Sequence, residues 1–329
     1  MTNRERIINT LNFKAVDRGP MVEWAAWWDK TVERWKEEGL DPSLNTTEIM
    51  AQFGIDDLKQ FWISHMGNGL PEIHEHGKGP IADEADYDKY HFALYPDDAV
   101  KWAHERMLEL KPGHDRGDYA IWMTLDGYFW FPRKLFGIEN HLFSFYDEPA
   151  LYHRICEDLC QFHLKVIDDF CAVIVPDFMS FAEDMSYNNG PMLSEDLFDE
   201  FIKPYYKRVI AKLKSYGIKV FVDTDGNVMP MIPWLLDCGV EGILPLERQA
   251  GVDVAEIRRT YPDLLMLGGY DKMVMKRGEA AMREEFERLL PVVRTGGYIP
   301  SVDHQTPPDV SLENYRIYAK LFQEYAEKI

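Results

Sequence analysis

The stretch IKVFVDTDGNVMPMIPWLLDCGVEGILPLE, residues 218–247, decides the fold class. It begins with a short apolar segment typical of a buried strand, continues through a helical segment and ends in a second apolar strand. Two strands joined by one helix are typical of a parallel β-α-β unit. Strand-like and helix-like segments alternate in this way from about residue 117 onward. The sequence therefore predicts a parallel sheet covered by helices.

Apolar periodicity and helix-terminal residues mark the other segments. The predicted strands cover residues 19–27, 119–125, 176–184, 218–226, 240–247, 264–271 and 297–304. The predicted helices cover residues 148–174, 194–217, 229–239, 254–262, 279–296 and 311–329. At least six β-α units without a Gly-x-Gly-x-x-Gly motif favour an α/β fold of the (β/α)8 TIM-barrel type over a dinucleotide-binding sheet.

Residues 55–116 break the alternation, because they are rich in glycine, histidine and aromatic residues. We therefore predict an insertion over residues 55–116 at one end of the barrel. With 329 residues and 46% apolar composition the chain can bury a large core. We expect a single domain that covers residues 1–329.

Charge and cysteine usage exclude several classes of protein. The net charge is -20, from 36 basic and 56 acidic residues, and no run of Lys or Arg is present. Nucleic acid and anionic membranes are therefore poor partners. Four cysteines without a Cys-x-x-Cys pair favour a reduced, cytoplasmic protein. No signal-peptide pattern and no apolar run long enough to span a membrane are expected.

Acidic residues follow one predicted strand after another. In a TIM barrel the reactive groups lie at the carboxyl ends of the strands. The charged residues at these ends are Asp126, Glu183, Asp184, Asp223, Asp225, Glu247, Asp271, Asp303 and His304. Crowded carboxylates repel one another and are costly to desolvate without a partner. The basic residues near these ends are few, so a divalent cation is the simplest compensation.

The predicted metal ligands are Glu183, Asp223, Asp225 and His304. Asp223 and Asp225 share one face if the strand continues that far, and the other two come from other strands. Carboxylate and imidazole suit zinc, manganese or iron. In the structural alternative, Asp-x-Asp-Gly after a strand is a loop whose aspartate caps the next helix, and a lone histidine is more often structural.

Aromatic residues near the strand ends predict an apolar cap over this polar floor. The predicted substrate contacts are Trp24, Trp27, Trp28, Tyr128, Phe129 and Tyr187. Such a cap would suit a small aromatic or methylated substrate, although core packing is the alternative for about half of these residues. A second histidine cluster, His65 with His74 and His76, lies in a glycine-rich segment, where lining a pocket or facing solvent is the simpler interpretation.

Several stretches resemble the uroporphyrinogen decarboxylase-like superfamily over nearly the whole chain. They are NRERIINTLNFKAVDRGPM, LSEDLFDEFIKPYYKRVI, GVEGILPLE, LGGYDKMVMKRG and GGYIPSVDHQTPPDVSLENYR. The resemblance implies a TIM barrel. The superfamily contains two kinds of enzyme. Decarboxylases bind substrate carboxylates with an arginine-rich N-terminal loop, and the other kind are corrinoid-dependent methyltransferases. Here AAWWDKTVERW stands in place of that loop, so decarboxylation of a polyanionic porphyrinogen is not expected.

The methyltransferase branch binds zinc through a His-x-Cys pair and a late cysteine. In this chain those places read Asp223-Thr224-Asp225 and His304, and the acidic position after the strand at 176–184 matches Glu183 or its neighbour. Oxygen ligands make a harder site than thiolates and leave zinc a stronger Lewis acid. The exchange therefore favours an ether oxygen over a thiol such as coenzyme M as the group that the metal activates.

The resemblance thus implies a methyltransferase that moves a methyl group from a methoxylated substrate, a methoxyphenol above all, to cob(I)alamin. The chain contains no Asp-x-His-x-x-Gly motif, so the cobalamin is expected on a separate corrinoid protein. Asp184 or His65 would protonate the departing oxygen. The alternatives are a metal-dependent decarboxylase or lyase acting on a small aromatic acid, and a binding barrel without activity. A homodimer is compatible with the sequence.

Overall fold

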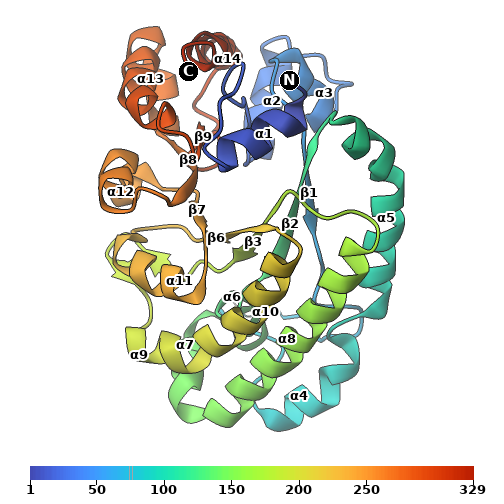
Figure 1. Cartoon of the computed structure of the whole chain (residues 1–329). Coiled ribbons are helices and arrows are strands. Elements are labelled where there is room, and N and C mark those ends of the chain that lie inside the picture. Colours follow the sequence, from blue (N-terminus) through green and yellow to red (C-terminus); the bar gives the residue numbers. More distant parts are fainter. Residues whose placement is uncertain (74, 76) are drawn as a thin grey trace.

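The computed structural model describes residues 1–73, 75 and 77–329, and it is built around one parallel sheet (Figure 1). The strands, in their order across the sheet, are β1 (Leu58–Trp62), β2 (Ala120–Asp126), β3 (Phe178–Ala182), β6 (Lys219–Asp223), β7 (Gly242–Leu244), β8 (Leu265–Tyr270) and β9 (Tyr298–Val302). Every neighbouring pair in this sheet is parallel. The α/β class and the parallel sheet predicted from the sequence are confirmed.

Helices cover the outer face of the curled sheet. The longer ones are α5 (Asp97–Arg116), α7 (Ile138–Asp147), α8 (Pro149–Cys171), α10 (Lys203–Ser215), α13 (Glu279–Val293) and α14 (Leu312–Ala326). The shorter ones are α1 (Asn3–Leu11), α2 (Asp29–Glu37), α3 (Thr46–Gln52), α4 (Glu84–Tyr90), α6 (Trp130–Phe136), α9 (Glu195–Phe201), α11 (Ile232–Cys238) and α12 (Val254–Thr260). A two-stranded hairpin, β4 (Ser186–Tyr187) and β5 (Gly190–Pro191), follows β3. No helix within the described residues is both long enough and apolar enough to cross a bilayer.

The predicted helix over 194–217 is two helices. The Ser194 side chain accepts from the backbone N–H of Leu197 and starts α9, which ends at Phe201. Pro204 stands in the first turn of α10. Proline has no N–H and clashes with the preceding turn of a continuous helix, so it is tolerated at the start of a new one.

Residues 55–116 are not an insertion, and that prediction was wrong. They contain β1, which pairs in register with β2 from Leu58↔Ala120 to Trp62↔Thr124. They also contain α5, which packs on α8 outside the sheet. The segment therefore supplies one β-α unit of the fold, with additional loops between its strand and its helix.

The strand predicted over 19–27 is not formed, but part of this segment lies between the two edge strands. The N–H of Asp56, just before β1, donates to the carbonyl of Met21 at 2.7 Å. On the other side, the Trp24 indole N–H donates to the carbonyl of Val302 in β9 at 2.6 Å. Val22 packs inside the sheet with residues from several strands. The extended segment 20–24 thus spans the gap that the seven strands leave among the described residues.

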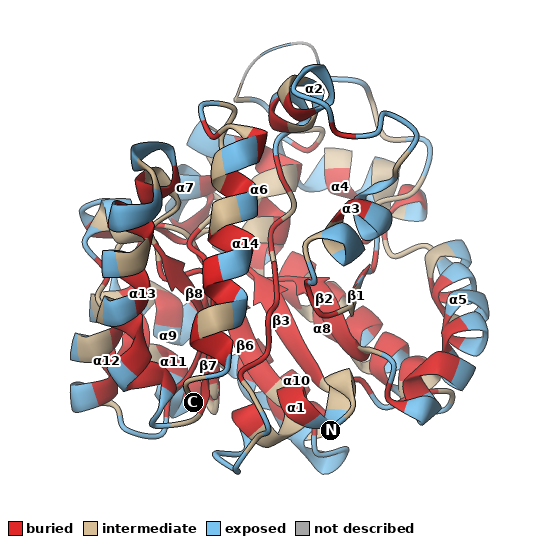
Figure 2. Cartoon of the chain, turned by 90° about the horizontal axis from the view of Figure 1, so that it is seen from above, coloured by how far each residue is buried: buried red, intermediate tan, exposed pale blue. Residues whose placement is uncertain are grey.

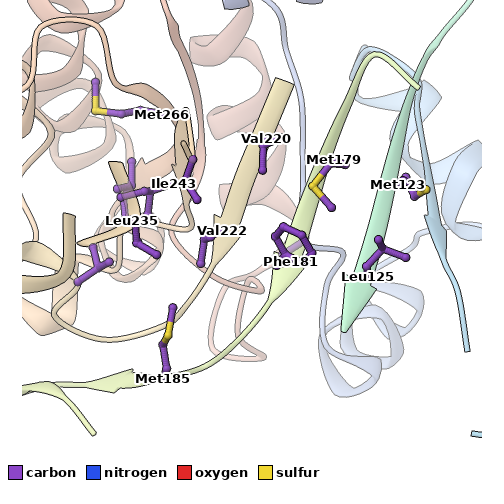
Figure 3. Packing of buried hydrophobic residues seen from close by; sticks show 14 of the residues in the cluster. Met123, Leu125, Met179, Phe181, Met185, Val220, Val222, Leu235, Ile243 and Met266 are labelled. Atoms are coloured by element: carbon purple, nitrogen blue, oxygen red, sulfur yellow. The ribbon is translucent and has the colours of Figure 1, made fainter. Parts of the chain in front are cut away.

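Alternate residues of the strands face the helices and build the main core. Figure 3 shows Met123 and Leu125 of β2, Met179 and Phe181 of β3, and Val220 and Val222 of β6 in this layer. All six are fully buried. Figure 2 shows the same division for the whole chain, with buried residues in the sheet and exposed residues on the outer faces of the helices. The residues between them point inward.

The inward side chains form layers that become more polar toward the carboxyl ends of the strands. The first layer is part of an apolar cluster and includes Trp122, Phe178 and Ile299. Two residues further along come hydroxyls such as Thr124, which hydrogen-bonds Ser180. Two further again are Asp126 in β2, Asp223 in β6 and Asp303 after β9. The fold therefore places carboxyl groups in one layer, above an apolar floor.

Candidate functional site

The carboxyl end of the sheet is called the mouth below. Some of its acidic residues have a positively charged partner, and others do not. Asp126 belongs to the first group, since Lys134 Nζ lies 2.6 Å and His65 Nδ1 3.1 Å from its Oδ2. Trp62 Nε1 donates to its Oδ1 at 3.3 Å. Burial works to raise the pKa of Asp126, but His65 and Lys134 outweigh it and hold that pKa well below its usual range.

Asp303 is also compensated. Lys272 Nζ lies 3.1 Å from its Oδ1, and the backbone N–H of Arg248 donates to its Oδ2 at 3.0 Å. The backbone N–H of Lys272 adds a third donor at 3.3 Å. Asp303 therefore ties the loops after β7 and β8 to the end of β9, and it is a structural residue of the mouth.

Asp184, Asp223 and Asp225 are uncompensated. No lysine or arginine within the described part of the chain forms an ion pair with them, although Arg133 acts on Asp184 and Lys272 on Asp225 from a longer distance. The His304 imidazole lies closest to Asp225, with 3.6 Å between its Nε2 and Asp225 Oδ2. Burial and the neighbouring carboxyls raise the pKa of Asp225 to about 7 and that of Asp223 well above its usual range. Burial also raises the pKa of Asp184 and lowers that of His304.

The backbone at Asp184 supports a functional role for this group. Its φ of +41° lies in the left-handed region, which is costly for a residue with a side chain. Its carboxyl accepts the backbone N–H of Asp225, so the loops after β3 and β6 are joined at this point. Strained residues that the surroundings hold in place are concentrated at functional sites.

Glu183 points away from this group. Its two oxygens accept the backbone N–H groups of Tyr128, Phe129 and Trp130 at 2.8–3.0 Å and the hydroxyl of Tyr206. The residue is fully buried, and burial raises its pKa to about 7. With four donors its acceptor positions are occupied, so the prediction that it binds a metal is replaced by a structural role at the start of α6.

Whether a cation fits is decided by the donors that remain. Within the described residues, no three His, Cys, Asp or Glu side chains converge closely enough to hold an ion as they stand. The chemistry of the group nevertheless fits a divalent cation. Three crowded carboxyls with raised pKa and one neutral imidazole would be relieved by it, and oxygen with imidazole nitrogen suits zinc. Of the predicted ligands, the structure brings Asp225 and His304 within 3.6 Å of each other, and Asp223 is a neighbouring carboxyl of Asp225.

Three predicted substrate contacts belong to the core. Tyr128 and Phe129 are fully buried, and Phe129 packs edge-on against His141 at 4.4 Å between ring centroids. Trp27 is almost fully buried against Trp35 and Tyr315. The predictions for Tyr128 and Phe129 were wrong, because a side chain without exposed surface cannot contact a ligand in the mouth. Trp27 still borders a hollow of about 490 Å³ together with Trp28.

The other three aromatic predictions lie at or near the mouth. Trp24 packs edge-on against His304 with 6.1 Å between ring centroids. Tyr187 is 50% exposed, and its backbone passes so close to Gly226 that a Cβ there would lie 2.5 Å from it. Trp28 is 45% exposed and lines a hollow of about 490 Å³ together with Gln305.

His65 cannot be a direct proton donor to a substrate, because it is fully buried. Its Nε2 lies 3.0 Å from Nε2 of His163, and its Nδ1 faces Asp126. His74 and His76 lie outside the described residues. The sequence reasoning missed His163, because a histidine within a periodic helix gives no signal of its own. Lys134 was recognised as one of the few basic residues near the strand ends, but its ion pair with Asp126 was not predicted.

A parallel curled sheet with an acid-lined carboxyl end defines an α/β protein whose functional groups lie at the strand ends. The family model described as uroporphyrinogen decarboxylase (URO-D) matches residues 133–325 of this chain. The chain belongs to the uroporphyrinogen decarboxylase family, as the resemblance in the sequence indicated. No curated protein matches it.

Two solved structures superpose on this chain over most of its length. A methyltransferase from Methanosarcina mazei superposes with a TM-score of 0.68 at 16% identity, covering 99% of each chain. The "Putative Vitamin-B12 Independent Methionine Synthase" of Listeria monocytogenes superposes with a TM-score of 0.46 at 12% identity, covering 95% of this chain and 99% of its own. The first likeness extends the fold over the whole chain, including the part before residue 133.

Proposed function

We propose that this protein is a methyltransferase that moves a methyl group from a methoxylated aromatic compound, a methoxyphenol, to cob(I)alamin on a separate corrinoid protein. The observation that carries the proposal is the group of Asp184, Asp223 and Asp225 beside His304, without a lysine or arginine partner among the described residues. This group suits a neutral or cationic ligand and repels a polyanionic one. The solved structure of similar fold from Methanosarcina mazei is named a methyltransferase, which agrees with the proposal.

Asp223, Asp225 and His304 would hold the metal, zinc in the first instance. A divalent cation bound there would draw electron density from the ether oxygen of the substrate. The chain itself supplies the surroundings of the ring, since the Trp24 indole lies beside His304 and Tyr187 is exposed nearby. Their flat apolar surfaces would exclude water from one side of the aromatic substrate.

Asp184 would supply the proton. When the carbon–oxygen bond of the methoxy group breaks, the methyl group goes to the reduced corrinoid and the electron pair stays on oxygen. Burial raises the pKa of Asp184 and so favours the protonated carboxyl that would donate to that oxygen. The backbone N–H of Asp225 keeps the carboxyl oriented toward the mouth.

The test is methyl transfer to cob(I)alamin, followed by the change in the corrinoid absorption spectrum. The protein is supplied with stoichiometric zinc and a panel of methoxylated aromatics. Methylcobalamin is expected with the wild type, and Asp225→Asn and His304→Gln are expected to lose both zinc and turnover. No product from any donor with zinc bound would overturn the proposal. Release of carbon dioxide from a small aromatic acid would favour a lyase instead.

A further inference from the structure

A buried chain of polar side chains runs from the mouth into the helical layer. Asp126 faces Nδ1 of His65 at 3.1 Å, and Nε2 of His65 faces Nε2 of His163 at 3.0 Å. Nδ1 of His163 faces the hydroxyl of Tyr128 at 3.2 Å. All four residues are fully buried, and they come from three separate stretches of the sequence. Burying four polar side chains is costly, so we infer that this arrangement has a role other than packing.

His65 lies between Asp126 and His163 in this chain. Burial and the neighbouring His65 keep the pKa of His163 well below its usual range, so His163 carries a single N–H. If the Tyr128 hydroxyl donates to His163, then His163 donates to His65. The chain ends in Nδ1 of His65, which lies 3.1 Å from Asp126 Oδ2.

Asp126 in turn holds the ammonium group of Lys134. Lys134 donates to Asp126 Oδ2 at 2.6 Å, and it combines a positive charge with a partly exposed side chain, 32% exposed. The indole of Trp62 and the imidazole of His65 share the negative charge of Asp126. An ammonium group has three N–H donors, so two remain after the bond to Asp126.

We propose that Lys134 is a substrate-anchoring residue that binds a ring oxygen of the methoxylated substrate, and that Asp126 and His65 are positioning residues that hold its ammonium group in the mouth. This inference rests on the proposed function and narrows its substrate class. The methyl donor then carries a hydroxyl or phenolate oxygen on the ring, distant from its methoxy group.

The spacing across the sheet supports binding of the ring oxygen and of the methoxy group at two separate places in the mouth. Asp126 is in register with Ala182, and Ala182 is in register with Asp223. The two aspartates are therefore two strands apart, about 10 Å at two strand spacings. Their side chains both point inward. A benzene ring with oxygens on opposite sides would reach from the Lys134 side of the mouth to the side of Asp223, Asp225 and His304.

The first experiment measures binding by calorimetry, which does not depend on turnover. The probes are a methoxyphenol and the methoxytoluene of the same substitution pattern, which has a methyl group in place of the hydroxyl. The wild type is expected to bind the phenol at least about tenfold more tightly, as for a charge-assisted hydrogen bond. Lys134→Met should abolish that preference while leaving the affinity for the methoxytoluene unchanged.

The outcomes separate this inference from the proposed function. Equal binding of the two probes by the wild type, or a preference that survives Lys134→Met, would overturn the role of Lys134 alone. If the wild type binds neither probe, the proposed substrate class falls and the inference with it. Because Lys134→Met leaves Asp126 with less compensation, the double variant Lys134→Met, Asp126→Asn provides a neutral pair for the same comparison.

The second experiment tests His65 by two replacements that keep different contacts. Asn can place an amide N–H near the position of Nδ1 and keep the donor to Asp126, whereas Gln reaches the position of Nε2 and keeps only the contact with His163. The preference for the phenol should survive His65→Asn and fall about tenfold in His65→Gln. His141→Gln is the matched control, because His141 is equally buried and bonds a tyrosine hydroxyl, that of Tyr152. Equal losses in both His65 variants would overturn the positioning role.

Discussion

At the scale of single residues, Glu183 shows how a buried carboxyl organises the start of a helix. Its four donors include three successive backbone N–H groups that α6 itself leaves without intrahelical partners. The chain must pass close to this carboxyl, and Gly127 makes that passage. A Cβ at residue 127 would lie 1.9 Å from the carboxyl carbon of Glu183. Only glycine fits there, although its φ is not in the left-handed region.

Replacing Gly127 with alanine is therefore expected to destabilise the protein. Glu183 cannot move aside without breaking its hydrogen bonds, so the free energy of unfolding should fall by about 2–3 kcal/mol, as in other overpacked cores. Urea denaturation followed by circular dichroism measures this. Gly67→Ala is the comparison, since its Cβ would meet its nearest atom at 3.3 Å. Equal stability of the two variants would contradict the tight contact at residue 127.

Glu23 gives a second prediction at this scale, on pH dependence. It is buried, its Oε1 accepts from Tyr318 at 2.6 Å, and its Oε2 has no hydrogen-bond partner among the described residues. Burial raises its pKa to about 8, above the ordinary 4.5. A group whose pKa is raised by folding stabilises the protein below about pH 4.5 and loses that contribution as the pH rises through 8.

Glu23→Gln should remove this loss, because glutamine stays neutral at every pH. Relative to the wild type, the variant is expected to gain on the order of 2 kcal/mol at pH 9 and little at pH 5. The melting temperature measured from pH 5 to pH 9 checks this, with Glu195→Gln on the exposed start of α9 as the control. A variant that is less stable than the wild type at pH 9 would refute a protonated Glu23.

The sequence identified the edge at which the acidic residues lie, but not the direction of each side chain. Glu183 and Asp225 both follow strands that the apolar pattern predicts, so both were expected at the mouth. Glu183 points toward α6 because three backbone N–H groups donate to its carboxyl there. The position of these N–H groups depends on the path of another segment, residues 127–130. No local pattern around Glu183 contains that information.

At the scale of elements, β1 and the segment 20–24 show where periodicity fails. The sequence of β1, LKQFW, carries Lys59 and Gln60 and is only partly buried, since it is an edge strand of the described sheet. It therefore lacks the apolar run that marks the inner strands. Segment 20–24 shows the opposite combination of sequence and structure. It is apolar and reads as a strand, yet it lacks the ladder of hydrogen bonds and is held by side chains instead.

Asp56 is the residue expected to hold that segment in place. It is buried, accepts two hydrogen bonds from Arg18 at 2.6 and 2.9 Å and receives the N–H of Met21 at 2.9 Å. Asp56→Ala leaves Arg18 without this partner and should lower the free energy of unfolding by about 3 kcal/mol. Hydrogen exchange should rise most in residues 18–24. Asp57→Ala, at the more exposed neighbouring position, is the control, and unchanged exchange in Asp56→Ala would contradict this function.

At the scale of the whole molecule, the carboxylates behind the net charge of -20 differ in whether a basic side chain lies beside them. Many surface carboxylates have lysine or arginine partners, as Glu324 has in Arg283 and Lys328. The unfavourable repulsion between carboxyl groups is concentrated at the mouth, in Asp184, Asp223 and Asp225. The residues that follow the predicted strands indicated an acidic rim. Which of these acids lack partners depends on the loops after six strands, and these loops come together only in the folded chain.

This concentration predicts how stability and metal binding respond to pH. Folding raises the pKa of Asp225 to about 7 and also raises those of Asp184 and Asp223. Their contribution to stability is therefore present below about pH 4 and is lost as the pH rises through 7. With a chelator present, the melting temperature should fall from pH 5 to pH 8. Zinc binds the deprotonated carboxyls, so it should raise the melting temperature more at pH 8 than at pH 5 and release protons on binding. Asp225→Asn should flatten both dependences, whereas a zinc effect that is independent of pH would place the ion elsewhere than at these carboxyls.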